Sequence, residues 1–131
     1  MLYTNSDGGA RGNPGPGAIG VLIRKNNKII KTYSKKVGKV TNNVAEYLAL
    51  IKALELALKY EKEVTCILDS ELIVKQLNNE YKVKNVKLKT LFEKVKKLGK
   101  KFRKVSYKHV SRWDKFQRIA DRLLNKELDK E

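Results

Sequence analysis

The feature that most constrains the fold is a short apolar segment near the middle of the chain. Residues 64–68 read Val-Thr-Cys-Ile-Leu and are followed by Asp69. An apolar run without polar alternation is typical of a strand that is buried on both faces. The segment therefore predicts a central strand in a sheet covered by helices, and with it an α/β fold.

The flanking sequence predicts the remaining elements of that fold. We expect strands at residues 2–7, 18–24, 29–37, 64–68 and 102–110. We expect helices from Asn42 or Asn43 to about Tyr60, from Ser70 to about Asn78, along the apolar stripe Leu88–Leu98, and after Asp114. Three leading strands with hairpin connections, followed by alternation of strands with helices, indicate a mixed sheet.

Composition bounds the class of protein. The 131 residues suit a single domain, 1–131, and 41% hydrophobic with 34% charged residues is a globular profile. No apolar run approaches the ~18 residues of a membrane span, and the first residues lack a secretion signal, so we expect a cytoplasmic protein. The single cysteine, Cys66, excludes an intramolecular disulfide and a cysteine-built zinc site, and we expect a buried, inert thiol.

Net charge is the strongest compositional signal. The chain carries 30 Lys and Arg against 14 Asp and Glu, a net charge of +16. Residues 82–104 hold eleven basic residues and one acid, Glu93, which concentrates +10 of that charge in 23 residues. This distribution favours a nucleic acid or another polyanion as the partner, and a solvated lysine-rich surface is the alternative.

Four carboxylates stand where an acid is not expected by default. Asp7 and Asp69 lie at the carboxyl ends of two predicted strands, where α/β sheets bind ligands, and Asp121 lies inside the last helix. At about 100° per residue, Glu46 lies opposite the polar face of its helix, so its carboxylate points inward.

An unpaired buried carboxylate is costly, and three arrangements would remove the cost. Glu46 could pair with a basic residue, carboxyls could stay protonated, or Asp7, Glu46 and Asp69 could converge on divalent cations. Magnesium prefers a few carboxylates together with phosphate oxygens, and two such ions clamp the attacking and leaving oxygens of a phosphodiester. The glycine-rich segment 8–17 is predicted as a loop. It either lets a bulky polymer approach the backbone closely or is a hairpin loop without a binding role.

Four motifs taken together resemble ribonuclease H of type 1. They are Asp-Gly-Gly-Ala-Arg-Gly-Asn-Pro-Gly-Pro-Gly at 7–17, Thr-Asn-Asn-Val-Ala-Glu-Tyr at 41–47, Leu-Asp-Ser at 68–70 and Ala-Asp-Arg-Leu at 120–123. The resemblance runs from about residue 2 to 124 and is strongest to the compact archaeal and bacterial subgroup. It implies a five-stranded mixed sheet with helices on both sides, three antiparallel strands coming first and strands alternating with helices after them. It also implies endonucleolytic hydrolysis of the RNA strand of an RNA–DNA hybrid with two Mg²⁺ or Mn²⁺ ions, leaving 5′-phosphate and 3′-hydroxyl ends.

The resemblance also assigns roles by position. The four carboxylates that hold the metals in the family are matched by Asp7, Glu46, Asp69 and Asp121. Residues that touch the hybrid are matched by Gly8, Gly9, Ala10, Asn13, Lys39, Thr41, Asn42, Asn43 and Ser70. The implied partner is an RNA–DNA hybrid, duplex RNA is a second candidate, and we expect a monomer.

The chain departs from the family pattern in two places. Residues 78–87 are too short for the basic protrusion of many members, although Lys82, Lys84, Lys87 and Lys89 supply charge there. Gln117 replaces the asparagine of the subgroup's Asn-x-x-Ala-Asp pattern, which puts a local hydrogen bond in question but not the carboxylate of Asp121.

The residue that assists the leaving group is left open. Many family members place a histidine about ten residues before the final aspartate. His109 stands twelve residues before Asp121, within a strand pattern, so we expect it to pack at the end of the sheet. Arg112, nine residues before Asp121, lies in the loop and is the favoured candidate for holding a phosphate, and neither residue is the third alternative. Trp113 beside it is either an aromatic that caps the core or a platform for base stacking.

Two rival functions accompany the nuclease interpretation. One is a hybrid- or RNA-binding module without catalysis, against which the four intact carboxylates argue. The other is a DNA-acting enzyme of the same fold, such as a Holliday-junction resolvase. The pair Asn42-Asn43 and the segment Asp-Gly-Gly-Ala at 7–10 favour RNA recognition instead.

Overall fold

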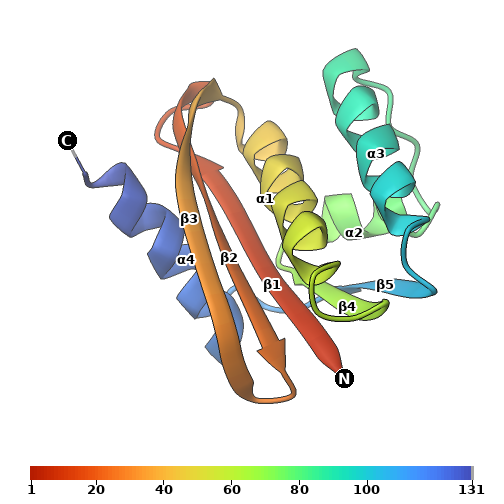
Figure 1. The fold of residues 1–131 in the computed structure, drawn as a ribbon. Helices are drawn as coiled ribbons and strands as arrows, with labels where there is room; N and C mark the ends of the chain where they lie inside the picture. Colours follow the sequence, from red (N-terminus) through yellow and green to blue (C-terminus); the bar gives the residue numbers. More distant parts are fainter. Residues whose placement is uncertain (131) are drawn as a thin grey trace.

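One five-stranded sheet organises the molecule, and the computed structural model describes its residues 1–130 (Figure 1). The strands are β1 (Leu2–Ala10), β2 (Gly15–Lys25), β3 (Lys28–Val40), β4 (Glu63–Leu68) and β5 (Lys104–His109). The helices are α1 (Asn42–Ala57), α2 (Glu71–Leu77), α3 (Val86–Gly99) and α4 (Lys115–Leu128). Within the described residues, no helix combines the length and the apolar character that a membrane crossing requires.

The strands lie in the order β3-β2-β1-β4-β5. β1 pairs antiparallel with β2 and β2 with β3, whereas β4 runs parallel to both β1 and β5. The predicted mixed sheet, with three antiparallel strands first, is confirmed. Because β1 and β4 are parallel neighbours, their carboxyl ends meet at the same edge of the sheet.

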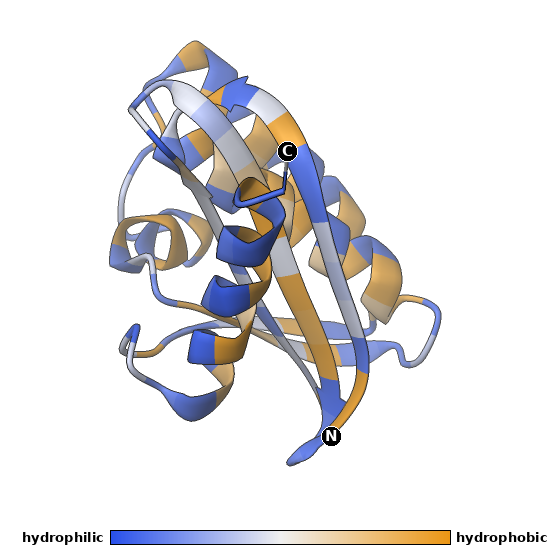
Figure 2. Cartoon of the chain, turned by 90° about the vertical axis from the view of Figure 1, so that its left-hand side faces the viewer, coloured by the Kyte–Doolittle hydropathy of each residue, from blue (hydrophilic) through white to orange (hydrophobic). Residues whose placement is uncertain are grey.

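Helices cover both faces of this sheet. α4 packs across β1, β2 and β3 on one face, and α1 packs on β1 and β2 from the other, with α3 beside α1 (Figure 1). Seen from its own side, α4 carries hydrophilic residues outward, while hydrophobic ones face the strands behind it (Figure 2). The prediction that β4 is buried on both faces is confirmed, because Cys66 and Leu68 belong to the main core and Ile67, on the other face, is 6% exposed.

Two glycines allow the helices to approach the strands closely at the positions that carry acids. A Cβ at Gly8 of β1 would lie 2.2 Å from the carbonyl oxygen of the α1 residue that precedes Glu46. A Cβ at Gly20 of β2 would lie 2.2 Å from the carbonyl oxygen of the α4 residue that precedes Asp121. A side chain at either glycine would therefore push a helix, and its carboxylate, away from the sheet.

The boundaries near the glycine-rich segment differ from the prediction. Most of the predicted loop at 8–17 is strand, because the β1–β2 ladder continues to the pair Ala10 and Gly17 and leaves only residues 11–14 as the turn. Ladder hydrogen bonds satisfy the backbone here although glycine has a low strand propensity. β3 likewise continues past a register shift to Val40.

The start of α1 also differs by one residue from the prediction. Thr41, rather than Asn42 or Asn43, is the N-cap, and its hydroxyl accepts the N–H of Val44 at 3.2 Å. Asn42 Oδ1 instead accepts the N–H of Ala10 at 2.9 Å, which ties the helix to β1. The predicted caps Ser70 of α2 and Asp114 of α4 are confirmed.

Candidate active site

Three carboxylates from three elements converge at the edge where β1 and β4 end. Asp7 lies on β1, Glu46 near the start of α1 and Asp69 directly after β4. Each offers one oxygen, and these oxygens lie within 4.8 Å of one another. Asp7 and Glu46 are each 7% exposed, and Asp69 is half-buried. The predicted convergence of these three residues is thus present in the fold, and we term them the acidic cluster.

The backbone of β1 holds Glu46 in its inward direction. The N–H of Gly8 donates to Glu46 Oε1 at 2.5 Å. The salt bridge considered for Glu46 is wrong, since among residues 1–130 no Lys or Arg nitrogen lies within 4.0 Å of a carboxylate oxygen of the acidic cluster. Protonation and bound cations therefore remain as the two ways to stabilise the cluster.

Burial without a counter-charge shifts the titration of the acidic cluster. Desolvation raises the pKa of Asp7 far above its ordinary range, and the neighbouring charge of Glu46 raises it further. Desolvation also raises the pKa of Glu46 and of Asp69. Without a cation, the cluster therefore retains a proton at neutral pH, which binding of a divalent cation would displace.

Asp121, the fourth predicted carboxylate, lies outside this cluster on the exposed side of α4. Its Oδ1 accepts a hydrogen bond from Asn125 Nδ2 at 3.2 Å. Its charge raises the pKa of Asp7 and of Asp69, so it acts on the same site. We term the shared space, of about 410 Å³, the carboxylate hollow. It is lined by Asp7, Asp69, Arg112, Trp113, Arg118, Asp121 and Arg122.

Sequence reasoning missed two arginines that line the carboxylate hollow, Arg118 and Arg122. They stand three residues before and one residue after Asp121, so the 3.6-residue period places all three on one side of α4. That spacing is the signal by which the sequence could have identified them.

A buried polar network fixes α4 against β1 beneath the hollow. Gln117, which is 0% exposed, donates from Nε2 to the carbonyl oxygen of Ser6 at 2.8 Å and accepts from Asn5 Nδ2 at 3.2 Å. Asn5 Oδ1 accepts from Nε of the buried Arg24 at 3.0 Å. Gln117 also lies close enough to Asp69 to lower its pKa. Both amide atoms of Gln117 are therefore hydrogen-bonded, although the sequence put a local hydrogen bond at this position in question.

The residues predicted to touch a nucleic acid gather at the start of α1. The N–H of Asn42 donates to Asn13 Oδ1 at 3.0 Å, which joins the β1–β2 turn to the helix. Beside them lies a second space of about 460 Å³, the asparagine hollow. It is lined by Asn13, Thr41, Asn42, Asn43, Val44, Asn85, Lys87 and Leu88. Asn85, the N-cap of α3, was not predicted, and its place just before the apolar stripe of that helix is the signal for it.

The remaining residues that were predicted to contact the hybrid lie in three different places. Gly8, Gly9 and Ala10 form the end of β1. Lys39 is exposed near the end of β3 and lines neither of the two hollows. The hydroxyl of Ser70 accepts the N–H of Ile73 at 3.3 Å as the cap of α2. Substrate contact by these residues stays a prediction.

His109 and Arg112 occupy different surroundings. The prediction that His109 packs at the end of the sheet is wrong, because β5 is an edge strand and its last two residues, on opposite faces, are both exposed. The charge of His109 nevertheless lowers the pKa of Asp69. Arg112 lines the carboxylate hollow directly. Trp113 is 68% exposed, so its interpretation as a core cap is wrong.

Comparison with known proteins agrees with this geometry. A family model described as Reverse transcriptase-like matches residues 5–126. Ribonuclease HI of Halobacterium salinarum is 37% identical over 130 residues, which cover 98% of this chain and 64% of that protein. A bifunctional protein of Mycobacterium tuberculosis is 36% identical over 131 residues, which cover 98% of this chain and 35% of that protein. The chain thus spans about a third of the length of the mycobacterial relative.

Solved structures extend the similarity to the whole fold. The crystal structure of ribonuclease H1 from Halobacterium salinarum has a TM-score of 0.92 at 33% identity, covering 98% of this chain and 97% of that one. A ribonuclease H1 in complex with an RNA/DNA hybrid has a TM-score of 0.90 at 39% identity, with the same two coverages of 98% and 97%.

Proposed function

The chain belongs to the ribonuclease H family, and on that premise we propose that it hydrolyses the RNA strand of an RNA–DNA hybrid. The observation that carries the proposal is the acidic cluster, three converging carboxylate oxygens without a cationic partner among residues 1–130, in a protein of net charge +16. An acidic site repels a phosphate polymer unless divalent cations lie between them, and that arrangement is the one that phosphodiester hydrolysis uses.

The donor set fits Mg²⁺ or Mn²⁺. Carboxylate oxygens are hard ligands of the type these ions prefer, and the raised pKa of Asp7 and Glu46 marks a charge cluster that a cation would stabilise. We propose that Asp7, Glu46, Asp69 and Asp121 hold two ions. When bound, the ions supply an activated water and neutralise charge that develops on the phosphate.

The chain's own residues position these groups and the substrate. The N–H of Gly8 fixes Glu46, and the Gln117 network fixes the helix that carries Asp121. The guanidinium groups that line the carboxylate hollow offer fork-shaped donors to phosphates near the cut. We assign charge stabilisation at the leaving group to Arg112 rather than His109, because Arg112 lines that hollow. The expected products carry 5′-phosphate and 3′-hydroxyl ends.

The asparagine hollow is the candidate for recognition of the hybrid. Its amide side chains donate and accept hydrogen bonds, which suits the 2′-hydroxyls and base edges of a minor groove, and Lys87 adds a positive charge. One solved relative was crystallised with an RNA/DNA hybrid, which supports the same partner here. We propose further that the protein acts as a cytoplasmic monomer and that duplex RNA is a secondary substrate.

A cleavage assay on three duplexes of one sequence tests the proposed function. With Mg²⁺ or Mn²⁺, we expect cutting of the RNA strand of the hybrid, slower cutting of the RNA duplex, no cutting of the DNA duplex, and loss of activity with a chelator. Equal cutting of hybrid and DNA duplex would favour the DNA-acting alternative. Hybrid binding without cleavage under any divalent cation would favour a binding module.

A further inference from the structure

The single tryptophan of the chain lies on the rim of the carboxylate hollow with one ring face free. The guanidinium carbon of Arg112 lies 4.6 Å from the ring centroid of Trp113, so the cation covers one face of the indole. Trp113 is nevertheless 68% exposed, and a ring with one face covered reaches such exposure only if its other face is open to solvent.

The segment that carries this ring is held in place. The N–H of Trp113 donates to Ser111 Oγ at 3.1 Å, and the N–H of Asp114 donates to the carbonyl oxygen of Ser111 at 3.0 Å. The carboxylate of Asp114 then accepts the N–H groups of Phe116 and Gln117 at 3.0 and 3.1 Å as the cap of α4. Trp113 is therefore anchored at the start of the helix that also carries one of the acids.

The chemistry around the ring selects a nucleotide as its ligand. Arg112, Arg118 and Arg122 line the same hollow as the three aspartates, so they offer guanidinium partners to a phosphate once divalent cations offset the acids, while the open indole face offers an apolar plane. A nucleotide combines both properties in one unit, a phosphate for a guanidinium and a base for the ring.

Base pairing restricts which nucleotide can bind in this way. Inside a duplex, both faces of each base are covered by its neighbours in the stack, so away from the ends of a duplex an indole on the protein surface stacks only with an unpaired base. Because the ring borders the same hollow of about 410 Å³ as Asp7, Asp69 and Asp121, the unpaired base must lie close to the phosphate that is cut.

We infer that Trp113, backed by Arg112, is a stacking platform for an unpaired base of the RNA strand next to the cut. The inference rests on the proposed function and narrows it: the preferred hybrids are those in which the RNA strand leaves the duplex within a few nucleotides of the cleaved bond. Trp113 is thus a specificity-determining residue for junctions between hybrid and single-stranded RNA.

Intrinsic fluorescence tests the stacking without requiring cleavage. Trp113 is the only tryptophan, so emission excited at the red edge of protein absorption reports on this residue alone. With Mg²⁺ and the Asp69→Asn variant, which we expect to bind the hybrid without cutting it, we titrate the protein with a blunt hybrid, with hybrids extended by unpaired RNA at either end, and with hybrids extended by unpaired DNA. Stacking predicts stronger quenching by one of the RNA extensions than by the blunt hybrid or the matched DNA extension.

Cleavage kinetics supply the second readout. Trp113→Ala should lower kcat/KM about tenfold more on the quenching RNA-extended hybrid than on the blunt hybrid. Trp113→Phe, which keeps a stacking face, should restore most of the loss. Tyr60→Ala is the control, since Tyr60 is an exposed aromatic (39%) beyond the end of α1 and lines neither hollow. Unchanged thermal midpoints verify that the variants fold.

The outcomes separate this inference from the proposed function. Equal quenching by all hybrids, or equal loss on blunt and extended hybrids in Trp113→Ala, would overturn the stacking platform while the nuclease function stands. Selective quenching by an RNA extension, in a protein that cuts no hybrid, would overturn the proposed function and support the platform.

Discussion

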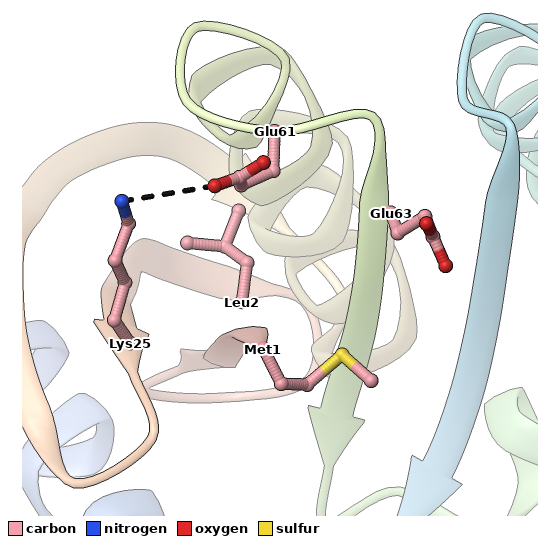
Figure 3. A pocket seen from close by; sticks show the side chains of 5 residues that line it. All are labelled: Met1, Leu2, Lys25, Glu61 and Glu63. Carbon is pink, nitrogen blue, oxygen red and sulfur yellow. Dashed lines mark ion pairs between the residues drawn. The ribbon is translucent and has the colours of Figure 1, made fainter.

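Acidic side chains at the two ends of the sheet have opposite electrostatic surroundings. Where β1 begins, a pocket of about 280 Å³ is lined by Met1, Leu2, Lys25, Glu61 and Glu63 (Figure 3). Here Glu61 pairs with Lys25 at 3.7 Å, the ion pair drawn in Figure 3, and Glu63 pairs with Arg103. Where β1 ends, the acidic cluster has no Lys or Arg partner within 4.0 Å among residues 1–130.

The two ends therefore shift carboxyl titration in opposite directions. The hydrogen bond and charge of Arg103 lower the pKa of Glu63, whereas desolvation raises the pKa of Asp7. With 30 basic residues in the chain, a nearby cation is the default for an acid. The acidic cluster lacks such a neighbour, which identifies the end of the sheet where we propose that divalent cations, rather than side chains, neutralise the charge.

The largest expected effect separates the two ends by catalysis. Asp69→Asn should reduce hybrid cleavage by at least a hundredfold, because it removes a ligand oxygen charge from the acidic cluster, while hybrid binding is kept or becomes tighter. Glu61→Gln, at the paired end, should leave the rate unchanged. Single-turnover cleavage and equilibrium binding measure both quantities. If Asp69→Asn keeps more than about a tenth of the rate, a barrier change under ~1.4 kcal/mol, its role in metal binding is wrong.

The features of the fold and of the acidic cluster that could be predicted are those that depend on residues close together in the sequence. The inward direction of Glu46 follows from helical geometry alone, and the burial of β4 follows from its apolar run, so both could be predicted. Asp7 was predicted at the end of its strand, which is wrong because β1 continues to Ala10; the parallel pairing of β1 with β4 nevertheless stops at Asn5, so Asp7 and Asp69 lie at one edge.

The features that could not be predicted depend on tertiary contacts. β1 and β2 extend through glycines because the ladder pairs them, against local propensity. The exposure of His109 follows from the place of β5 at the edge of the sheet, and that of Trp113 from its place on the rim of the hollow. The residues that flank His109 and Trp113 in the sequence do not indicate that these two side chains lie at a sheet edge or on the rim of a hollow.

The second prediction concerns which lysine side chains contribute to binding of the hybrid. Lys84 is exposed between α2 and α3, and Lys87, exposed in the first turn of α3, lines the asparagine hollow. Replacing both with glutamine should weaken hybrid binding and reduce the slope of log K against log salt by about 1 to 2, since about two phosphate contacts are lost. Binding is measured by anisotropy across a salt series.

A control with the same charge change distinguishes location from net charge. Lys28 and Lys31 lie exposed at the start of β3, at the paired end of the sheet. Their double replacement with glutamine should leave the salt slope unchanged. Equal slopes for both double variants and the parent protein would show that the basic run is a solvated surface.

The third prediction concerns stability in the absence of metal. Asp7 and Glu46 have folded pKa values above their ordinary values of 3.8 and 4.5, so the folded state binds more protons than the unfolded state above about pH 4. The contribution of these two groups to the free energy of unfolding should therefore fall as pH rises from about 4 toward 7, and relative to the parent protein Asp7→Asn should gain stability over that range and be about 1 kcal/mol more stable at neutral pH.

Urea unfolding in chelator at several pH values measures this effect. Addition of Mg²⁺ should reverse the order, because the parent protein gains binding energy that Asp7→Asn partly loses. An unfolding free energy that rises from pH 4 to 7 by the same amount in both proteins would contradict the electrostatic cost assigned to the acidic cluster.

The smallest effect is expected at the paired end and tests the other half of the comparison. Lys25 and Glu61 keep about half of their side-chain surface exposed, 53% and 49%, so water screens their attraction. A double-mutant cycle with Lys25→Gln and Glu61→Gln should give a coupling free energy under about 0.5 kcal/mol, which falls further in high salt. The cycle separates the attraction from the loss of either side chain alone. A coupling above about 1 kcal/mol, insensitive to salt, would mean that this end also stores substantial electrostatic energy. Electrostatic energy would then be substantial at both ends of the sheet, stabilising at the paired end and destabilising at the acidic cluster.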